Sequence, residues 1–552
     1  MMLTPNSISE PFSPLMVMDG KRSSLPEDFH QEDIDLFSQM VEEIEDMWLK
    51  ARLADLVWLL QRPRNTKFAL MAIDAYREIP LTTEVWACGG KECWERAISL
   101  ALMLRSGAGD RLQEIEMALI AAAKLSTQED GFLAFWLTEL MFGNHLGHGE
   151  EANLASHLET LANGFESTGD LHRSKEYFEV SAKWYERAKN KGKAVELTIL
   201  VAEAWVKQAE ARISGGIPSH MVAASFYEKA IQKYRTIPRA QRKAHSVDER
   251  ILEINKLMSE AGERSLGEMG RISSPRVDIT EIVEHARSEV SGKNAADALL
   301  ALANIHQGAC VTSIRKNAKD MLEKHFLQRL FSSTHMSRDG RVIAKAPSMR
   351  LGDVESDENK VVLWAEMVKD YGMELGLVVQ GEIIPAVEIL HLEHRLRESD
   401  FMAICSDSPI VPPGREHLFG KGLFAGYDQD FATSIHLLVP QIEHLVRYHL
   451  KAKGVKTTNL DVNGIENENG LSTLIDLPEV KEMFGDNLAF ELKALFCDPF
   501  GPNLRNEVAH GLLGYRECIS AYTVYAWWLC LKMAFNTFWN AREKVATQTG
   551  AN

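Results

Sequence analysis

The stretch from Asp430 to Lys453, DFATSIHLLVPQIEHLVRYHLKAK, decides the fold class of this chain. Its apolar residues recur every three or four positions, so they share one face of an α-helix and predict an amphipathic helix. Pro440 lies inside the pattern and, because it lacks an N–H group, predicts a kink there. The apolar positions are Ile435, Leu438, Ile442, Leu445, Val446 and Leu450.

The same period dominates the sequence on both sides of this helix. Residues 35–60 and 152–161 repeat it, without the alternation of Val, Ile and Thr that is typical of strands. Residues 337–345, SRDGRVIAK, are an exception and predict a turn with short extended flanks. We therefore predict an all-α protein, in which an N-terminal region of irregular, repeat-like helical hairpins precedes a C-terminal helical bundle.

Breaks in the helical pattern divide the chain. Pro5, Pro11 and Pro14 lie in a segment rich in Ser and Asp, and Gly262 to Pro275 is rich in residues that end helices. We expect a flexible N-terminal arm at 1–30 and a helical region at 31–265 that could serve as a sensor or regulator. A connecting helical segment with a short extended turn follows at 276–360, and a helical domain occupies 361–552.

Residues 150–240 predict stacked helical hairpins. The run from Ala223 to Ile231, which ends before Pro238, resembles the second helix of a tetratricopeptide repeat. The comparable helix around Phe178 does not lie one repeat period away. Irregular helical packing is therefore favoured over a peptide-binding array, which stays the alternative.

Composition narrows the class of protein. The chain has 552 residues, 45% of them hydrophobic and 25% charged, as in folded globular proteins of two or three domains. A formal net charge of −17 argues against a protein that coats nucleic acid or an anionic membrane through a broad basic surface. The seven cysteines lack a second close pair for a zinc site, so we expect reduced, mostly buried thiols.

Two features predict a cytoplasmic protein without a membrane span. The N-terminus soon becomes acidic and lacks the basic and apolar regions of a signal peptide. The most apolar stretch, residues 519–535, is interrupted by Lys532 and is shorter than the roughly 20 residues that a spanning helix needs.

A turn and a following helix carry the candidate chemistry. Residues 498–503, DPFGPN, contain two prolines and a glycine and cannot continue a helix. Asn503 is then expected to cap a helix running to about residue 541, with Arg505 and Asn506 in its first turn. Asn506 and His510 are four residues apart, so they share a helix face, and the long Arg505 side chain can reach the same cleft.

These residue types suit RNA cleavage without a metal. His510 has the side chain whose ordinary pKa, about 6.5, lets it accept a proton from a 2′-hydroxyl or donate one to a leaving oxygen. Arg505 can hold two phosphate oxygens as negative charge develops. Asn506 can orient the imidazole or the phosphate.

The pattern Arg505-Asn506-x3-His510-Gly511 resembles the RNxxxHG signature of a bacterial and eukaryotic domain-of-unknown-function family. That family is similar to the HEPN (higher eukaryotes and prokaryotes nucleotide-binding) ribonucleases. The resemblance covers roughly the last 270 residues. It extends to residues 339–341 (DGR), 411–416 (VPPGRE), 422–426 (GLFAG) and 438–443 (LVPQIE).

The resemblance implies a HEPN-like bundle that dimerises around a composite cleft and cleaves RNA, often as a toxin or antiviral defence effector. It implies a bacterial source for such an enzyme. Arg505, Asn506 and His510 are the expected catalytic residues, and Glu443, Asn503 and Gly511 are expected to support them. We expect no metal and no cofactor. RNA is the expected substrate, and a protein regulator or antitoxin is a further partner that the resemblance implies.

Three alternatives stay open from the sequence. Arg505 could pair with Glu507 or Asp498 while His510 is a structural histidine. Glu443 could orient Arg505 or His510, or form an ordinary ion pair with Arg447. The whole bundle could instead serve as the dimerisation module of a non-catalytic interaction or scaffold protein.

Two further groups need a structure to be judged. His391 and His394 have a spacing that can bind zinc, but a solvated polar face is the more common reading. The last helix carries apolar residues on more than one face, which predicts a homodimer surface. Its members are Tyr522, Tyr525, Trp528, Leu529 and Phe535.

Overall fold

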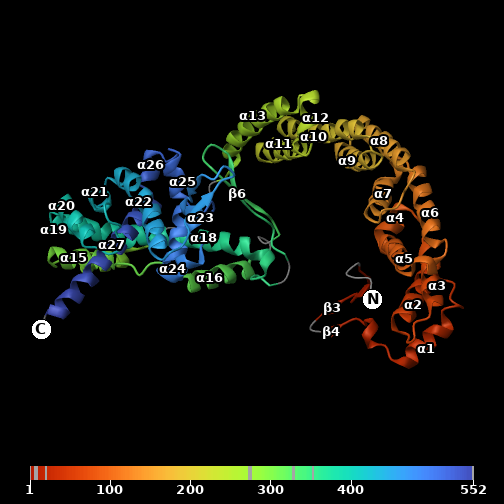
Figure 1. Cartoon of the computed structure of the whole chain (residues 1–552), viewed down its shortest axis with the longest axis horizontal. Coiled ribbons are helices and arrows are strands. Elements are labelled where there is room, and N and C mark those ends of the chain that lie inside the picture. Colours follow the sequence, from red (N-terminus) through yellow and green to blue (C-terminus); the bar gives the residue numbers. More distant parts are fainter. Residues whose placement is uncertain are drawn as a thin grey trace. The chain divides into compact units, whose positions relative to one another are not determined.

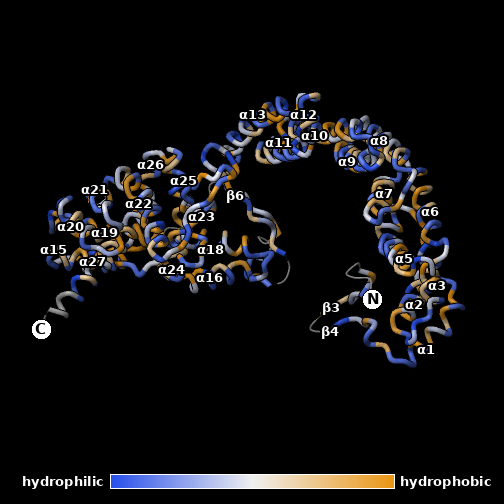
Figure 2. The backbone as a smooth tube through the Cα atoms, viewed as in Figure 1, coloured by the Kyte–Doolittle hydropathy of each residue, from blue (hydrophilic) through white to orange (hydrophobic). Residues whose placement is uncertain are grey.

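The computed structural model describes residues 2–4, 10–18, 21–270, 277–325, 330–350 and 353–549, with side chains to residue 544. It is 70% helical with 4% strand, so the all-α prediction is confirmed. The chain forms two compact units, residues 1–269 and 270–552, which we call unit 1 and unit 2 (Figure 1). Hydrophobic residues run along the helices of both units (Figure 2). Among the described residues, unit 1 buries them in two clusters and unit 2 in one.

Unit 1 begins with two short hairpins and continues as helices. Its strands are β1 (Met2–Leu3), β2 (Phe12–Ser13), β3 (Val17–Met18) and β4 (Lys21–Arg22). Its main helices are α1 (Gln31–Met40), α2 (Met47–Leu60), α3 (Thr66–Arg77), α4 (Thr83–Val85), α5 (Lys91–Leu104), α6 (Arg111–Leu125), α7 (Leu133–Gly143), α8 (Glu151–Ser167), α9 (Leu171–Arg187), α10 (Lys191–Ser214), α11 (His220–Arg235), α12 (Arg239–Arg242) and α13 (Val247–Ser265). Single turns lie between them: η1 (Pro26–Asp28), the π-helical η2 (Trp86–Gly90), η3 (Arg105–Ala108), η4 (Gln128–Asp130), η5 (Lys243–His245) and η6 (Leu266–Glu268).

The N-terminal segment is partly packed. Leu3 and Phe12 pair across β1 and β2, and both are buried against the unit 1 core. The arm that we expected to be flexible is therefore anchored at these two residues, because burial of an aromatic side chain stabilises the contact. Pro5, one of the prolines behind that expectation, lies outside the described residues.

Helical hairpins follow one another in the second half of unit 1. Helices α8, α9, α10, α11 and α13 each pack against the next (Figure 1). Tyr227, Ala230 and Ile231, the residues of the repeat-like run, are buried between these helices. The expected hairpin arrangement is thus present.

Unit 2 contains the remaining elements. Its helices are α14 (Thr280–Val290), α15 (Ala295–Ala303), α16 (Val311–Lys324), α18 (Lys360–Val378), α19 (Ile384–Glu393), α20 (Glu398–Ser406), α21 (Glu416–Tyr427), α22 (Phe431–Ala452), α23 (Leu471–Leu474), α24 (Pro478–Phe496), α25 (Leu504–Ala509), α26 (Tyr515–Cys518) and α27 (Ala521–Thr549). The turns are η7 (Asp357–Asn359) and the π-helical η8 (Val379–Ile383). Two antiparallel hairpins interrupt them, β5 (Ser333–Met336) with β6 (Val342–Ala346) and β7 (Thr458–Leu460) with β8 (Glu466–Glu468).

The core of unit 2 contains segments that we assigned, from the sequence, to a connecting segment and to a separate domain. Helices α14, α15 and α16, which we expected to connect two domains, contribute Val290, Leu299 and Ile314 to the same core as α22 and α27. The boundary between the units falls at residues 269 and 270, inside the breaker-rich stretch. Gly262, where that stretch begins, still lies in α13, and its Ser-Ser-Pro segment lies outside the described residues.

Helix α22 runs through Pro440 as one element and buries the six apolar residues of its predicted face. The expected helix from Asn503 to about residue 541 is wrong, since the structure forms α25, α26 and α27 in its place. Gly511 lies between α25 and α26 with a φ of 65°, a conformation outside the right-handed helix. The chain therefore turns directly after His510.

The predicted dimer surface on the last helix is wrong. Four of its five residues, Tyr525, Trp528, Leu529 and Phe535, are at most 2% exposed and belong to the unit 2 core. The fifth, Tyr522, is half-buried and packs against that core. The indole Nε1 of Trp528 donates to the carbonyl of Leu302 in α15 at 2.8 Å. The extra apolar face of α27 is covered by helices of the same chain.

One stretch of the described residues, 357–393, is apolar and long enough to cross a membrane. Half of its most apolar window is buried inside the protein, as in the core helix of a soluble protein. The described part of the chain contains the seven cysteines as free thiols, four of them buried.

Candidate functional site

The motif begins at a turn that Asp498 organises. Its carboxylate accepts the backbone N–H of Phe500 at 2.9 Å and also the indole Nε1 of Trp364. Asn503 then stands at the N-cap position of α25, but with a left-handed backbone, φ 47° and ψ 44°. Its side chain makes no capping hydrogen bond, so the carbonyl of Asn503 supports the helix instead.

Helix α25 is short. It ends at Ala509, and His510 is its C-terminal cap, with its N–H donating to the carbonyl of Asn506 at 3.0 Å. His510 therefore lies one helical turn beyond Asn506, as the spacing predicted. The helix has six residues, too few for its N-terminus alone to form the phosphate site that we expected there.

Arg505 is held by Glu443 of α22. Its Nε donates to Oε2 of Glu443 at 2.8 Å, and the Arg505 side chain remains 32% exposed. The contact with Glu443 is present, whereas the alternative partners Glu507 and Asp498 do not pair with Arg505. Among the described residues, the two Nη groups of Arg505 have no hydrogen-bond partner, so they are available to a ligand.

A second arginine fixes the same carboxylate. Nη2 of Arg447 donates to Oε1 of Glu443 at 2.7 Å and to the carbonyl of Asn469, also at 2.7 Å. Arg447 also lies 3.2 Å from Glu468, and its side chain is 14% exposed, so this is no ordinary surface pair. Burial would raise the pKa of Glu443, but hydrogen bonds from Arg505 and Arg447 outweigh it and lower the pKa.

The remaining motif residues face outward or lie at the edge. His510 is exposed, and within the described part of the chain its ring makes no hydrogen bond or ion pair, so it is not a satisfied structural histidine. Asn506 is half-buried. Gly511 is exposed, and a Cβ added there would meet nothing within 4 Å, so its role is the turn itself. Close beyond it, Leu512, Tyr515 and Ile519 are exposed apolar residues.

The structure adds neighbours that the sequence did not identify. The ring of His335 on β5 meets Phe500 edge to face at 5.2 Å, and Arg338 pairs with Glu517 of α26. Burial lowers the pKa of His335. The pattern at residues 337–345 predicted a turn with short extended flanks, but only the tertiary fold brings that hairpin beside the motif.

The described histidine, cysteine and carboxylate side chains do not form a metal site. In the described ranges, no group of three or more His, Cys, Asp or Glu side chains could hold a metal ion. His391 and His394 contact different backbone carbonyls, those of Tyr427 and Lys293, so they do not form a pair of ligands.

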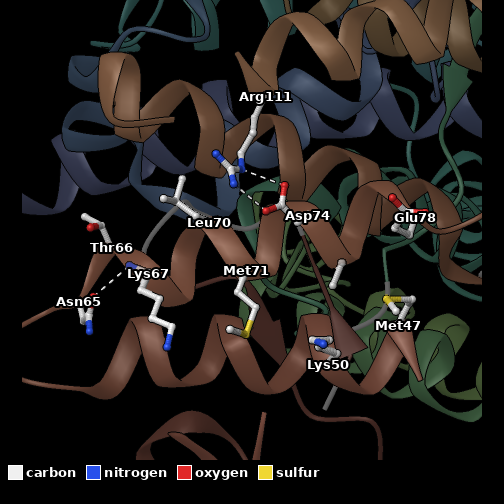
Figure 3. A pocket seen from close by; sticks show the side chains of 11 residues that line it. Met47, Lys50, Asn65, Thr66, Lys67, Leu70, Met71, Asp74, Glu78 and Arg111 are labelled. Atoms are coloured by element: carbon white, nitrogen blue, oxygen red, sulfur yellow. Dashed lines mark hydrogen bonds and ion pairs between the residues drawn. The ribbon is translucent and has the colours of Figure 1, made fainter. Parts of the chain in front are cut away.

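Unit 1 has a separate pocket of about 640 Å³ between α2, α3 and the start of α6 (Figure 3). The guanidinium of Arg111 donates to both oxygens of Asp74, at 2.8 and 2.7 Å, on one side of it. Lys50, Lys67 and Met71 are among the other lining residues.

A protein-family comparison matches part of unit 1. Residues 1–113 match the family model of a domain of unknown function, DUF7380. The match includes every residue that lines the pocket of Figure 3 and does not reach the motif of unit 2. No curated protein matches the chain.

One solved structure is similar, a "circular tandem repeat protein with novel repeat topology and enhanced subunit contact surfaces". It is 12% identical, with 94% of this chain and 91% of that chain covered, and the TM-score is 0.17. A similarity this low supports no argument on fold or function.

Proposed function

We propose that unit 2 is a metal-independent RNA endonuclease of the HEPN type that acts as a toxin or antiviral defence effector in the cytoplasm. The observation that carries this proposal is how the side chains of Arg505 and His510 are placed in the motif. Arg505 is oriented by Glu443, and neither its Nη groups nor the exposed ring of His510, one turn beyond Asn506, has a hydrogen-bond partner in the described part of the chain. Oriented cations and a titratable imidazole are the groups that phosphodiester cleavage needs.

In the proposed reaction, the imidazole of His510 accepts the proton of a ribose 2′-hydroxyl. The 2′-oxygen attacks phosphorus, the bond to the 5′-oxygen breaks, and a cyclic phosphate forms. The Nη groups of Arg505 stabilise the negative charge that develops on the phosphate oxygens. Asn506 orients the phosphate or the ring.

A second proton donor must then serve the leaving 5′-oxygen, because one chain supplies one motif histidine. We propose that a second copy of this chain supplies it across a two-fold axis. The exposed apolar residues Leu512, Tyr515 and Ile519, directly after His510, replace α27 as the proposed contact. Unit 1, with its own pocket, is proposed as the sensor or regulatory part.

The test is cleavage of RNA by the purified full-length protein in EDTA. We expect His510→Ala and Arg505→Ala each to abolish cleavage while the far-UV circular dichroism stays that of the parent. His417→Ala, a change elsewhere in unit 2, serves as the matched histidine control. Parental protein without activity would instead favour the non-catalytic interaction protein, and a variant that cleaves like the parent would show that the assigned catalytic role is wrong.

A further inference from the structure

A second cavity lies in unit 2, on elements that are separate from α25 and His510. It has a volume of about 1000 Å³ and is formed by the start of α16, by α18, by the turn at residues 475–477 and by α24. Trp364 and Phe490, whose rings meet edge to face at 5.4 Å, form part of its wall together with Phe484. A cavity of this size accommodates a ligand of metabolite size.

A thiol lines this cavity. Cys310 is exposed and precedes the first residue of α16, a helix of 14 residues. The hydroxyl of Ser313 donates to its Sγ at 3.3 Å, and the hydroxyl of Thr312 lies 3.3 Å from the same atom. These hydrogen bonds favour the thiolate and lower the pKa of Cys310 to about 7.

The backbone on both sides of the thiol is fixed. The N–H of Ala309 donates to Oε1 of the buried Glu491 at 3.1 Å, and the N–H of Val311 donates to Oδ1 of Asn487 at 3.0 Å. Both acceptors belong to α24, which also forms the opposite wall of the cavity. Cys310 is thus held at the cavity edge by two anchored neighbours.

The charged groups around the cavity favour an anion. Three cations line it against two carboxylates, an excess of one positive charge. Lys493 is paired with Asp476 at 2.6 Å. The ion pairs of Arg315 with Glu355 and of Lys481 with Asp486 are longer, 3.8 and 4.0 Å. Arg315 and Lys481 are therefore the cations that a ligand carboxylate would meet. The second carboxylate is that of Asp486.

We propose that this cavity binds low-molecular-mass disulfides that carry carboxylates, and that Cys310 reacts with them by thiol–disulfide exchange. The thiolate Sγ attacks one sulfur of the bound disulfide, a new S–S bond forms, and the ligand's own S–S bond breaks. The other half leaves as a thiolate, which takes a proton from water. The disulfide is the oxidant, so the atoms and electrons balance.

The first test compares Cys310 in the folded full-length chain with a peptide of residues 305–316, using glutathione disulfide and mass spectrometry of the Cys310 peptide. The pKa of the Cys310 thiol is about 7 in the folded chain and about 8.5 for an ordinary thiol, as in the peptide. At pH 7 the folded chain has more thiolate, but that thiolate is less nucleophilic, so the two effects together make its reaction roughly threefold faster than that of the peptide. Above about pH 9 the order should reverse, because only nucleophilicity then differs. A folded-chain rate equal to or below that of the peptide at pH 7 would overturn the proposal.

The second test separates reactivity from recognition. Arg315→Gln and Lys481→Gln should slow the reaction with glutathione disulfide several-fold and leave that with the neutral hydroxyethyl disulfide unchanged. Thr312→Val with Ser313→Ala should slow both reactions at pH 7 and move the half-maximal rate to higher pH. If the charge variants affect both disulfides equally, the cavity does not recognise the anion and the proposal fails.

Discussion

Two arginine–carboxylate pairs, one in each unit, show how burial assigns different roles to the same chemical groups. In unit 1, Arg96 uses Nε and Nη2 to hold both oxygens of Asp55 at 2.8 Å, and the side chains are 4% and 0% exposed. In unit 2, Arg505 uses only Nε toward Glu443 and is 32% exposed. The first pair is closed and structural, whereas the second leaves a guanidinium edge that can meet a phosphate.

The largest stability effect should come from the closed pair. Asp55→Ala leaves the buried guanidinium of Arg96 without its carboxylate and removes the acceptor of the Tyr76 hydroxyl, so it should cost roughly 3–5 kcal/mol. Urea unfolding, with hydrogen exchange of α2, α3 and α5 to locate the loss, measures this. A loss below about 1 kcal/mol would mean that water reaches the pair and that its burial does not distinguish it from the pair in unit 2.

A change in the exposed pair of Arg505 and Glu443 should affect RNA cleavage more than the free energy of unfolding. Glu443→Gln removes the charge that orients Arg505, and we expect RNA cleavage to fall about tenfold, which corresponds to about 1.4 kcal/mol in the barrier. The free energy of unfolding should change by no more than about 1–2 kcal/mol. Arg447→Gln, which breaks the other contact of the same carboxylate, is the control and should keep more activity. Equal losses for the two variants would point to a structural network.

The proposed contact between copies gives a third test. Tyr515→Glu adds a charge to an apolar surface next to His510, so it should convert a dimer to monomer and lower RNA cleavage. Sedimentation velocity measures the assembly. Met117→Glu, at an exposed apolar position in unit 1, is the control. Parental protein that is monomeric and still cleaves RNA would exclude the composite site.

The smallest expected effect concerns a buried carboxylate with no arginine. Glu491 accepts hydrogen bonds from Tyr371, Tyr525 and the N–H of Ala309, yet burial raises its pKa. A raised pKa means stability that is full below about pH 4.5, the ordinary value, and is lost as the pH rises through the folded value. Glu491→Gln should therefore become more favourable relative to the parent as pH increases from 4 to 8. Melting temperatures over this range that stay parallel would contradict the assigned cause.

The helices were readable from the sequence because the period of apolar residues is local. The six apolar positions of α22 became its buried face, and the turn at Asp498 preceded a helix with His510 one turn beyond Asn506. The end of that helix was misjudged, since Gly511 adopts its positive φ in a turn that no apolar period reveals.

Tertiary structure decided what each side chain does, because partners meet across long separations in the chain. Arg505 has a carboxylate two residues away in Glu507, yet it binds Glu443, 62 residues distant. The sequence predicted that Tyr525 and Trp528 lie on a surface, but in the folded chain α15 and α18 cover them. The thiol of Cys310 gains its cavity only when α24 packs beside α16. Sequence alone thus determined an all-α chain and a motif, while packing determined which of its charged groups are closed and which stay open.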